Sequence, residues 1–313
     1  MPGPAASKGA RPAPSRVVAV IVSYQPEFEA LKRLLTAVLP QVAAAVVVDN
    51  GSQAAVGAWL GDHFPGSLNF IGLGRNQGVA CAQNRGIDWA RRRGGDCVLL
   101  LDQDSEPAAD MVSTLAAALE SLQSQGVMVA CVGPRYLDER QDNPPPFIRV
   151  RGLHLERCPC PVPEAVVAVD YLISSGSLLP LAALEKVGGM REDLFIDYVD
   201  IEWGLRARRL GYQSFGVCAA RMRHALGEDP IGFWGRNFPR HSPLRHYYHF
   251  RNAALLCREG WVPLNWKVVD VWRLCLKYVF YCLLAKPRWE HCRSMSRGFW
   301  HGLRGKTGEF GAG

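Results

Sequence analysis

Short apolar runs alternate with amphipathic segments through the first third of the chain. The β-branched run at residues 16–24, RVVAVIVSY, predicts a strand buried on both faces. Residues 26–41 follow with apolar positions at helical spacing and a proline at the start, which predicts an amphipathic helix. The pattern of strand followed by helix then repeats as far as residue 104.

The repeat predicts three more strands and two more helices. The strands are expected at residues 44–52, 67–74 and 96–104, and the helices at residues 53–64 and 78–94. Strands that alternate with helices form parallel sheets covered by helices. The predicted fold class is therefore α/β, with a mostly parallel twisted sheet and flanking helices.

Polar residues stand at the carboxyl end of each of these four strands. They are Ser23 and Tyr24, Asp49 and Asn50, Arg75 and Asn76, and Asp102 and Asp104. In open α/β sheets, ligands bind outside the carboxyl ends of the strands. We expect these four strand ends to meet at one crevice.

The fourth strand ends in two carboxylates, in the sequence LLLDQDSEP at residues 99–107. If the backbone stays extended, Asp102 and Asp104 point to the same face. A bound Mg²⁺ or Mn²⁺ would relieve their mutual repulsion. A surface turn and a general acid/base pair are the alternatives at this stage.

Length and composition bound the class of protein. With 313 residues, of which 48% are hydrophobic, the chain can form one large domain with an extension. No apolar run approaches the roughly 20 residues of a membrane span. Residues 1–15 are rich in Pro, Ala and Gly and lack the apolar core of a secretion signal, so we expect a disordered tail.

The ten cysteines predict thiols rather than a disulfide framework, because the chain is large and shows no export signal. Most stand singly in apolar patterns, as do Cys97, Cys131, Cys218 and Cys257. Cys158 and Cys160 form a CPC pair, but no second pair of metal ligands accompanies them. A reducing cytoplasm is the expected location.

The net charge of +7 is concentrated near the C-terminus, where residues 264–313 carry nine Lys/Arg and three Asp/Glu. Residues 268–289 are apolar over much of a helix circumference, with Arg273, Lys277 and Lys286 interspersed. This pattern favours a helix at an anionic membrane surface, and a homodimer contact competes with it. The chain shows no nucleic-acid-binding module, so no nucleic acid partner is expected.

Two nucleotide-binding classes are excluded by the residues after the first strand. A dinucleotide fold requires Gly-x-Gly-x-x-Gly there, and this chain has SYQPEF. The phosphate-binding loop of P-loop proteins is missing from the sequence as well.

Several ordered motifs resemble those of the inverting family-2 glycosyltransferases of the GT-A fold over residues 16–260. These motifs are VVAVIVSY, VVVDNGS, GLGRNQGVACAQNRGI, LLLDQDSEP, YLISSGSLLP and FIDYVDIEWGLRARRLGY. More narrowly, LDQDS, FIDYVDIEW and RHYYHFRN resemble bacterial rhamnosyltransferases. The resemblance implies a GT-A domain at 16–260 followed by a basic, aromatic, amphipathic helical extension at 261–313.

The resemblance also implies roles for individual residues. The nucleotide would contact Ser23, Tyr24, Asp49, Asn76, Gly78 and Asp102. Mg²⁺ or Mn²⁺ would be held by Asp104, with Asp102 and His224 as further ligands, although His224 also fits an ordinary surface histidine. The substrate and acceptor contacts would be Ser175, Gly176, Glu202, Trp203, Tyr248 and Arg251.

The general base falls on Asp200 in the family pattern, and it would take the proton of the acceptor hydroxyl. Asp197 is the rival. Acidic residues at a helix N-terminus would account for either of them without catalysis.

The implied function is a metal-dependent inverting transfer of L-rhamnose from dTDP-L-rhamnose. The acceptor would be a hydroxyl of a bacterial cell-surface glycan or a lipid-linked glycan at the inner face of the plasma membrane. The alternatives are the same mechanism with a UDP-hexose donor (glucose, galactose or N-acetylglucosamine), a sugar-nucleotide pyrophosphorylase, and a non-catalytic glycan- or membrane-binding protein.

Overall fold

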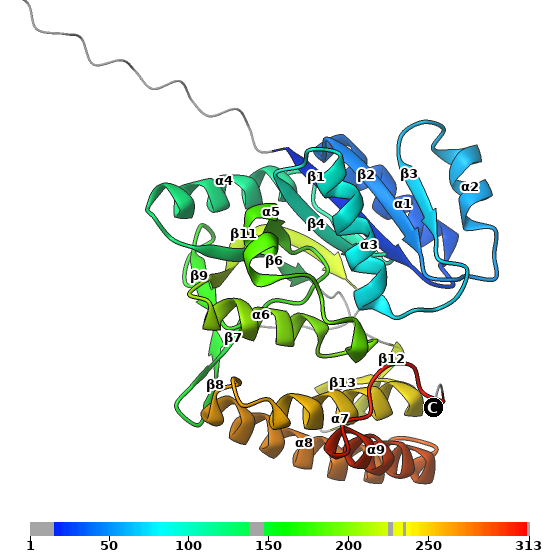
Figure 1. Ribbon diagram of the computed structural model, residues 1–313, viewed down its shortest axis with the longest axis vertical. Coiled ribbons are helices and arrows are strands. Elements are labelled where there is room, and N and C mark those ends of the chain that lie inside the picture. The colour runs from blue at the N-terminus through cyan, green and yellow to red at the C-terminus, as the bar shows by residue number, and fades with distance from the viewer. Residues whose placement is uncertain (1–15, 138–146, 225–227, 234–235, 312–313) are drawn as a thin grey trace, which may run out of the picture.

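A computed structural model describes residues 16–137, 147–224, 228–233 and 236–311, with backbone alone at 224, 228–233 and 236–240. The predicted disordered tail, residues 1–15, lies outside this part. Figure 1 shows an α/β body above a layer of three C-terminal helices.

The body is built on one mixed sheet in the order β3-β2-β1-β4-β10-β6-β11-β5, with β9 paired to β11. Its strands are β1 (Val17–Ser23), β2 (Ala44–Asp49), β3 (Asn69–Gly72), β4 (Cys97–Asp102), β5 (Ser105–Pro107), β6 (Val129–Leu137), β9 (Val166–Val169), β10 (Leu178–Pro180) and β11 (Gln213–His224). β1 to β4 are parallel to one another and β6 is parallel to β11, whereas β5, β9 and β10 run antiparallel to their neighbours. The predicted α/β class and mostly parallel sheet are confirmed.

Helices cover both faces of the sheet. Side chains of α1 (Phe28–Val38), α2 (Val56–His63) and α4 (Met111–Ser124) form the core on one face. Those of α3 (Val79–Arg92), α5 (Leu181–Val187) and α6 (Val199–Arg209) form the core on the other. Every residue of β1 is buried because helices cover both faces of the sheet. The continuous apolar run of this strand predicted burial on both faces.

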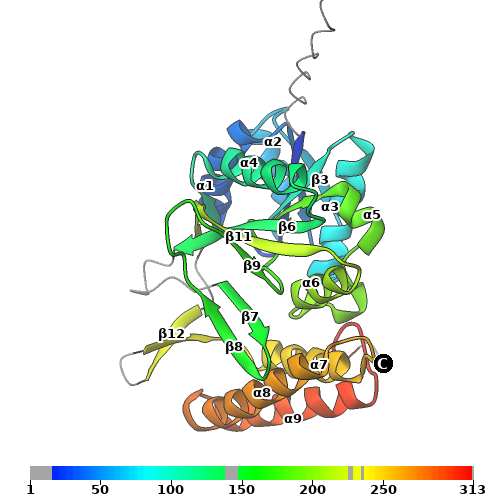
Figure 2. The ribbon, with the colours of Figure 1, turned by 90° about the vertical axis from the view of Figure 1, so that its left-hand side faces the viewer.

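The C-terminal layer consists of α7 (Pro243–Arg258), α8 (Leu264–Leu284) and α9 (Arg288–Leu303). Figure 2 shows the three helices stacked beneath the body, with the hairpin of β7 (Phe147–Arg151) and β8 (His154–Cys158) reaching toward them. A second hairpin joins β12 (Glu228–Phe233) to β13 (Arg236–Arg240). Among the described residues, no helix has both the length and the apolar character of a membrane span.

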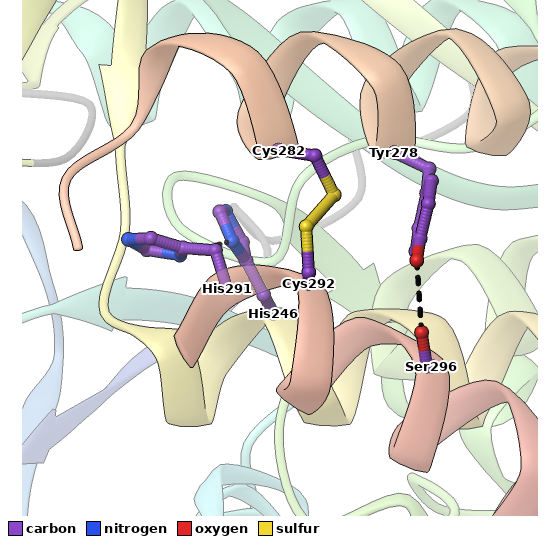
Figure 3. The surroundings of a disulfide bond; sticks show 6 residues. All are labelled: His246, Tyr278, Cys282, His291, Cys292 and Ser296. Atoms are coloured by element: carbon purple, nitrogen blue, oxygen red, sulfur yellow. Dashed lines mark hydrogen bonds between the residues drawn. A yellow bond between two sulfur atoms is a disulfide. The ribbon is translucent and has the colours of Figure 1, made fainter. Parts of the chain in front are cut away.

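Two disulfides contradict the expectation that the cysteines are thiols. Cys160 is bonded to Cys218, and Cys282 is bonded to Cys292, which joins α8 to α9 beside the hydrogen bond from Tyr278 to Ser296 (Figure 3). The prediction of a free thiol at Cys218 is therefore wrong. The local sequence gave no sign of the bond because the partner is 58 residues away. The isolated thiols at Cys97, Cys131 and Cys257 are as expected. Disulfides are rare in cytosolic proteins, so these bonds do not favour the predicted cytoplasmic location.

Candidate functional site

A cavity of about 670 Å³ opens at the carboxyl ends of β1, β2 and β4. The side facing the sheet, called the sheet wall here, consists of Val22, Tyr24, Asn50, Asn76, Gly78, Val79, Gln83, Asp102, Gln103 and Asp104. The opposite side, called the helical wall, consists of Phe195–Ile201, His241, Arg245 and His249. Tyr171, Ile173 and Ser174 complete the lining. The predicted convergence of strand ends at one crevice is confirmed.

The sheet wall is cross-linked by hydrogen bonds between successive strand ends. The Asn50 side chain donates to Asn76 Oδ1 at 2.9 Å and accepts from the Gln77 N–H at 2.8 Å. The Gln103 side chain bonds both backbone groups of Tyr24, at 2.7 and 3.1 Å. These bonds hold the lining in place before any ligand arrives. The polar strand ends predicted that Tyr24 and Asn76 line the site. Gln103 was missed because the sequence argument treated it only as the residue between the two aspartates.

Two predicted nucleotide contacts, Ser23 and Asp49, are buried behind the lining. Ser23 Oγ donates to Asp49 Oδ1 at 3.0 Å, and Ser52 donates to Asp49 from both its hydroxyl and its backbone N–H. Asp49 is 6% exposed. In this arrangement Asp49 fixes the turn after β2 that carries Asn50.

Asp102 at the end of β4 and Asp104 after it both line the cavity, but the backbone between them does not have the extended conformation that was predicted. The strand ends at Asp102, and residues 103–104 form a turn rather than extended backbone. The i, i+2 argument is therefore wrong, because the chain bends before Asp104. The turn itself presents both side chains to the cavity.

A hard divalent cation fits this pair of carboxylates. Mg²⁺ is commonly bound by one or two carboxylates together with substrate phosphates and water. Among the side chains that the structure describes, no three His, Cys, Asp or Glu residues gather as a metal site. The side chain of His224 lies outside the described part, although its backbone pairs with Ser105, next to Asp104.

The helical wall is built on a strained loop that precedes α6. Phe195, Asp197 and Tyr198 have φ values of 66°, 61° and 64°. Non-glycine residues avoid this region, and each such residue costs on the order of 1–3 kcal/mol. The strain persists because neighbouring side chains hold the loop carbonyls. At Gly78, which meets this loop, a Cβ atom would lie 2.6 Å from the Phe195 carbonyl oxygen.

Asp200 follows this loop at the start of α6, half-buried at the cavity. Burial raises the pKa of its carboxyl to about 6, the Ile201 N–H that donates to Oδ1 at 2.9 Å opposes this, and the negative charge of Asp197 adds to it. A carboxylate with such a pKa is ionised at neutral pH and is a stronger base than an exposed aspartate.

Asp197 also lines the cavity and differs from Asp200 in having a cationic partner. Arg245 donates to its Oδ1 at 3.3 Å, while Oδ2 is buried and has no hydrogen-bond partner within the described part of the chain. Burial raises the pKa of Asp197, and Arg245 counteracts the rise. Sequence reasoning named Asp197 as the rival base, and both carboxylates remain at the site.

The helical wall contains two histidines that sequence reasoning missed. Burial and the nearby Arg245 lower the pKa of His241 to about 4, and burial lowers that of His249 well below its usual value. His249 Nε2 lies 2.8 Å from the Nζ of Lys277 on α8. His249 stands within the RHYYHFRN motif, but nothing in that motif singled it out, and His241 lies just before α7, so only the packing of this segment brings the two to the cavity.

Gln83 on α3 was also missed, and it has an unusual environment. It is 2% exposed, it lines the cavity, and its Oε1 has no hydrogen-bond partner among the residues that the structure describes. A buried acceptor without a partner is costly unless a ligand supplies the donor. Its only sequence signal was a polar residue within an otherwise apolar helix face.

Four of the predicted substrate or acceptor residues lie behind the lining rather than in it. Ser175 accepts from the Asp102 N–H at 3.0 Å and so positions the end of β4. A Cβ atom at Gly176 would lie 2.7 Å from the Pro134 side chain, so protein atoms occupy the space beside this glycine. Glu202 pairs with Arg206, and the Trp203 indole donates to the Gly188 carbonyl.

Tyr248 and Arg251 on α7 also differ from their predicted role. Arg251 is 1% exposed, and its guanidinium donates to backbone carbonyls of Asp193, Leu194 and Gly308. Tyr248 stacks on Phe195 with ring centroids 5.0 Å apart. Both side chains therefore contact the strained loop, through its carbonyls and through Phe195, rather than the cavity.

Comparison with known proteins identifies relatives along nearly the whole chain. Residues 19–161 match the family described as Glycosyl transferase family 2. The chain is 32% identical to dTDP-rhamnosyl transferase of Shigella flexneri, over 94% of this chain and 97% of that protein. It is 24% identical to a hexosyltransferase of low-salt glycan biosynthesis from Haloferax volcanii, over 93% of this chain and 92% of that protein.

Solved structures share the fold at low identity. GalNAc-T7 with UDP, GalNAc and Mn²⁺ matches with a TM-score of 0.59 at 14% identity, over 94% of this chain and 57% of that chain. Residues 1–349 of S. aureus TarS in complex with UDP-GlcNAc match with a TM-score of 0.53 at 12% identity, over 93% of this chain and 92% of that chain.

Proposed function

The chain belongs to glycosyl transferase family 2, and we propose that it transfers L-rhamnose from dTDP-L-rhamnose to a hydroxyl of a bacterial cell-surface glycan or a lipid-linked glycan. The observation that carries this choice of donor is the 32% identity with a dTDP-rhamnosyl transferase over 94% of the chain. The cavity supports a transfer reaction, because its sheet wall offers polar strand ends and its helical wall offers a basic carboxylate.

In this proposal the nucleotide lies against the sheet wall. Tyr24, Asn76, Gly78 and Asp102 line that wall, while Ser23 and Asp49 support it from behind. Asp104 would hold Mg²⁺ or Mn²⁺ together with Asp102, which also lines the cavity. His224 would be a further ligand, since its backbone pairs with that of Ser105, the residue after Asp104. The bound ion would supply positive charge to the diphosphate.

Asp200 is the proposed general base on the opposite wall. Its carboxylate accepts the proton of the acceptor hydroxyl while that oxygen forms a bond to the anomeric carbon of rhamnose. The bond from that carbon to the diphosphate oxygen breaks, and dTDP leaves with the bonding electrons. Because attack and departure occur on opposite faces, dTDP-β-L-rhamnose gives an α-L-rhamnoside.

A thermal-shift titration tests the donor. Purified protein is mixed with dTDP-L-rhamnose, UDP-glucose, UDP-galactose or UDP-N-acetylglucosamine, each with Mn²⁺ or EDTA. Ligands of the native state raise the melting temperature by mass action. We expect the largest rise with dTDP-L-rhamnose and Mn²⁺. A larger rise with a UDP-sugar would assign the alternative donor, and no rise with any of them would favour the non-catalytic binding protein.

The membrane partner is supported by the outward face of α8. All exposed residues of this helix are apolar or cysteine: Leu264, Val268, Val271, Trp272, Cys275, Leu276, Val279 and Leu283. We call these eight residues the α8 apolar face. Its cations point inward instead, since Lys267 bonds the Glu259 carbonyl and Lys277 bonds His249. An outward apolar face on a terminal helix indicates that another surface covers it.

The charges beside this face favour an anionic bilayer at the inner leaflet over a second copy of the chain. Exposed cations on and beside α9 outnumber the exposed acids there: Lys286, Arg288, Arg293, Arg297, Arg304 and Lys306 against Glu290 and Glu309. Exposed Trp289 and Trp300 lie among them. Apolar insertion beside basic residues is typical of interfacial helices.

Vesicle flotation tests this partner. We expect the protein to float with phosphatidylglycerol vesicles but not with phosphatidylcholine vesicles, and the double variant Trp272→Lys, Leu276→Lys to stay in the soluble fraction. Leu210→Lys, which changes an exposed leucine on the body, is the matched control. A mass of two chains by light scattering, returning to one chain in the double variant without vesicle binding, would assign the face to a homodimer.

A further inference from the structure

At its start, the loop that carries the proposed base has short-range backbone hydrogen bonds, from the Ile196 N–H to the Leu194 carbonyl at 2.8 Å and from the Phe195 N–H to the Glu192 carbonyl at 3.0 Å. Three non-glycine residues between Phe195 and Tyr198 have positive φ, and Asp200 follows two residues later. The direction of the Asp200 carboxylate therefore depends on whatever fixes residues 194–198 from outside. From α3, the Val79 N–H donates to the Phe195 carbonyl at 2.8 Å, and the Tyr198 hydroxyl donates to Asp270 on α8 at 2.8 Å. The side chains that bond the carbonyls of the loop come from α7.

Asn252 on α7 binds this loop through its amide nitrogen. Nδ2 lies 2.9 Å from the Leu194 carbonyl oxygen, 2.7 Å from that of Ile196 and 2.9 Å from that of Asp197. Its two hydrogens are thus shared among three acceptors of one short segment. Asn252 is fully buried, so water does not compete for these carbonyls.

Arg251 sets the orientation of that amide. Its Nε donates to Asn252 Oδ1 at 2.8 Å, so the oxygen faces the guanidinium and the nitrogen faces the loop. Another nitrogen of the same guanidinium donates to the Leu194 carbonyl at 2.7 Å. We call Arg251 and Asn252 the carbonyl clamp.

The C-terminal segment completes the clamp from the other side. The Gly308 carbonyl accepts from Arg251, and the Gly308 N–H donates to the Asp193 carbonyl at 2.7 Å. The Phe310 N–H donates to the hydroxyl of Tyr248 at 2.8 Å, and Tyr248 stacks on Phe195. Residues more than 100 positions from Asp200 in sequence therefore support the start of its loop, Gly308 through Asp193 and Phe310 through Tyr248.

We infer that the carbonyl clamp, completed by residues 308–310, positions Asp200 for proton transfer, with Asn252 as the positioning residue. This inference rests on the proposed role of Asp200 as the base. A residue that served stability alone would change the melting temperature, whereas a positioning residue also changes turnover and the pH dependence of turnover at unchanged donor affinity.

The test compares Asn252→Asp with Asn265→Asp in the full chain. Asn252→Asp keeps the size of the side chain and replaces the donor that faces three carbonyls with an acceptor. Asn265 on α8 also donates to one backbone carbonyl, that of Gly152 at 3.1 Å, and lies outside the cavity lining. Release of dTDP from dTDP-L-rhamnose with Mn²⁺, donor affinity, and deuterium uptake of residues 194–204 are measured for both.

We expect Asn252→Asp to lower kcat on the order of 100-fold, since small displacements of reacting groups have effects of this size. Donor affinity should stay within about twofold, because the sheet wall is untouched. Deuterium uptake of the loop should rise, and the acidic limb of kcat should move to lower pH as water reaches Asp200. Asn265→Asp should resemble the wild type. Unchanged kcat, pH limb and uptake in Asn252→Asp would overturn the inference.

An unfolded Asn252→Asp variant and an inactive wild type each have an alternative measurement. If Asn252→Asp does not fold, a chain that ends at Gly305 takes its place, since it removes the Gly308 and Phe310 contacts to the clamp while Arg251 and Asn252 stay in place. Faster loop exchange and a lower kcat in that chain support the clamp, and wild-type values overturn it. If the wild type releases no dTDP with water as the acceptor, deuterium uptake alone decides whether Asn252 holds the loop, and the thermal-shift titration decides the donor separately.

Discussion

The two walls of the cavity are built on opposite principles. The sheet wall uses regular strand ends, and side chains such as Asn50 and Gln103 bond neighbouring strand ends directly. The helical wall uses a strained loop, an unpaired carboxylate oxygen at Asp197 and a raised pKa at Asp200. Apart from Gln83, the sheet wall is held by hydrogen bonds between strand ends, which suits it to binding, whereas the raised carboxylate pKa of the helical wall suits that wall to proton transfer.

The largest expected effect comes from the helical wall. Asp200→Asn should lower turnover of dTDP-L-rhamnose by about 10²–10⁴-fold, because general base catalysis contributes this much, and donor affinity should be kept. Steady-state kinetics and calorimetric titration measure the two quantities. Asp197→Asn is the matched control. Loss of turnover in Asp197→Asn with retention in Asp200→Asn would assign the base to the rival carboxylate.

The next largest effect should come from the sheet wall, and it should appear in binding. Asp104→Asn should weaken Mn²⁺-dependent donor binding by roughly 10–100-fold, the range seen when metal sites are perturbed. Asp62→Asn, which changes an exposed aspartate of α2, should bind like the wild type. Equal donor affinities with Mn²⁺ and with EDTA in the wild type would remove the metal from this wall.

The pH dependence distinguishes the walls again. Since the pKa of Asp200 is about 6, kcat should fall about tenfold per pH unit below pH 6, as the base becomes protonated. A raised pKa also means that the native state binds more protons than the unfolded state between about pH 4 and 6. This contribution to stability is therefore lost as pH rises through 6. Above pH 6, Asp200→Asn should melt at a higher temperature than the wild type, with no difference near pH 4.

The smallest expected effect concerns Gln83, the one buried side chain of the sheet wall whose acceptor lacks a partner among the described residues. Gln83→Leu should weaken donor binding by about 2–10-fold if a donor hydroxyl supplies the missing hydrogen bond. Gln125→Leu, at the exposed end of α4, is the control. Unchanged affinity in Gln83→Leu would show that the ligand does not reach this part of the wall.

Much of the sheet wall was predictable because its signals are local. An apolar β-branched run followed by polar residues defines a buried strand and its end, and parallel packing brings those ends together. This logic placed Tyr24, Asn76, Asp102 and Asp104 at the cavity correctly. It failed for Ser23 and Asp49, because whether a strand-end side chain faces the ligand or the supporting turn depends on the last backbone dihedrals.

By itself, the sequence determined the α/β alternation, the family and the carboxylates that line the cavity, since these depend on periodicity and on residue type. The tertiary structure alone decided that Arg251 and Asn252 hold backbone carbonyls, that His241 and His249 reach the cavity, and that Cys160 meets Cys218. Each of these depends on how α7 and the last strands pack against segments 50 or more residues away. Packing over such distances leaves no periodic signal in the chain, because any side chain of suitable size and polarity satisfies the local pattern equally well.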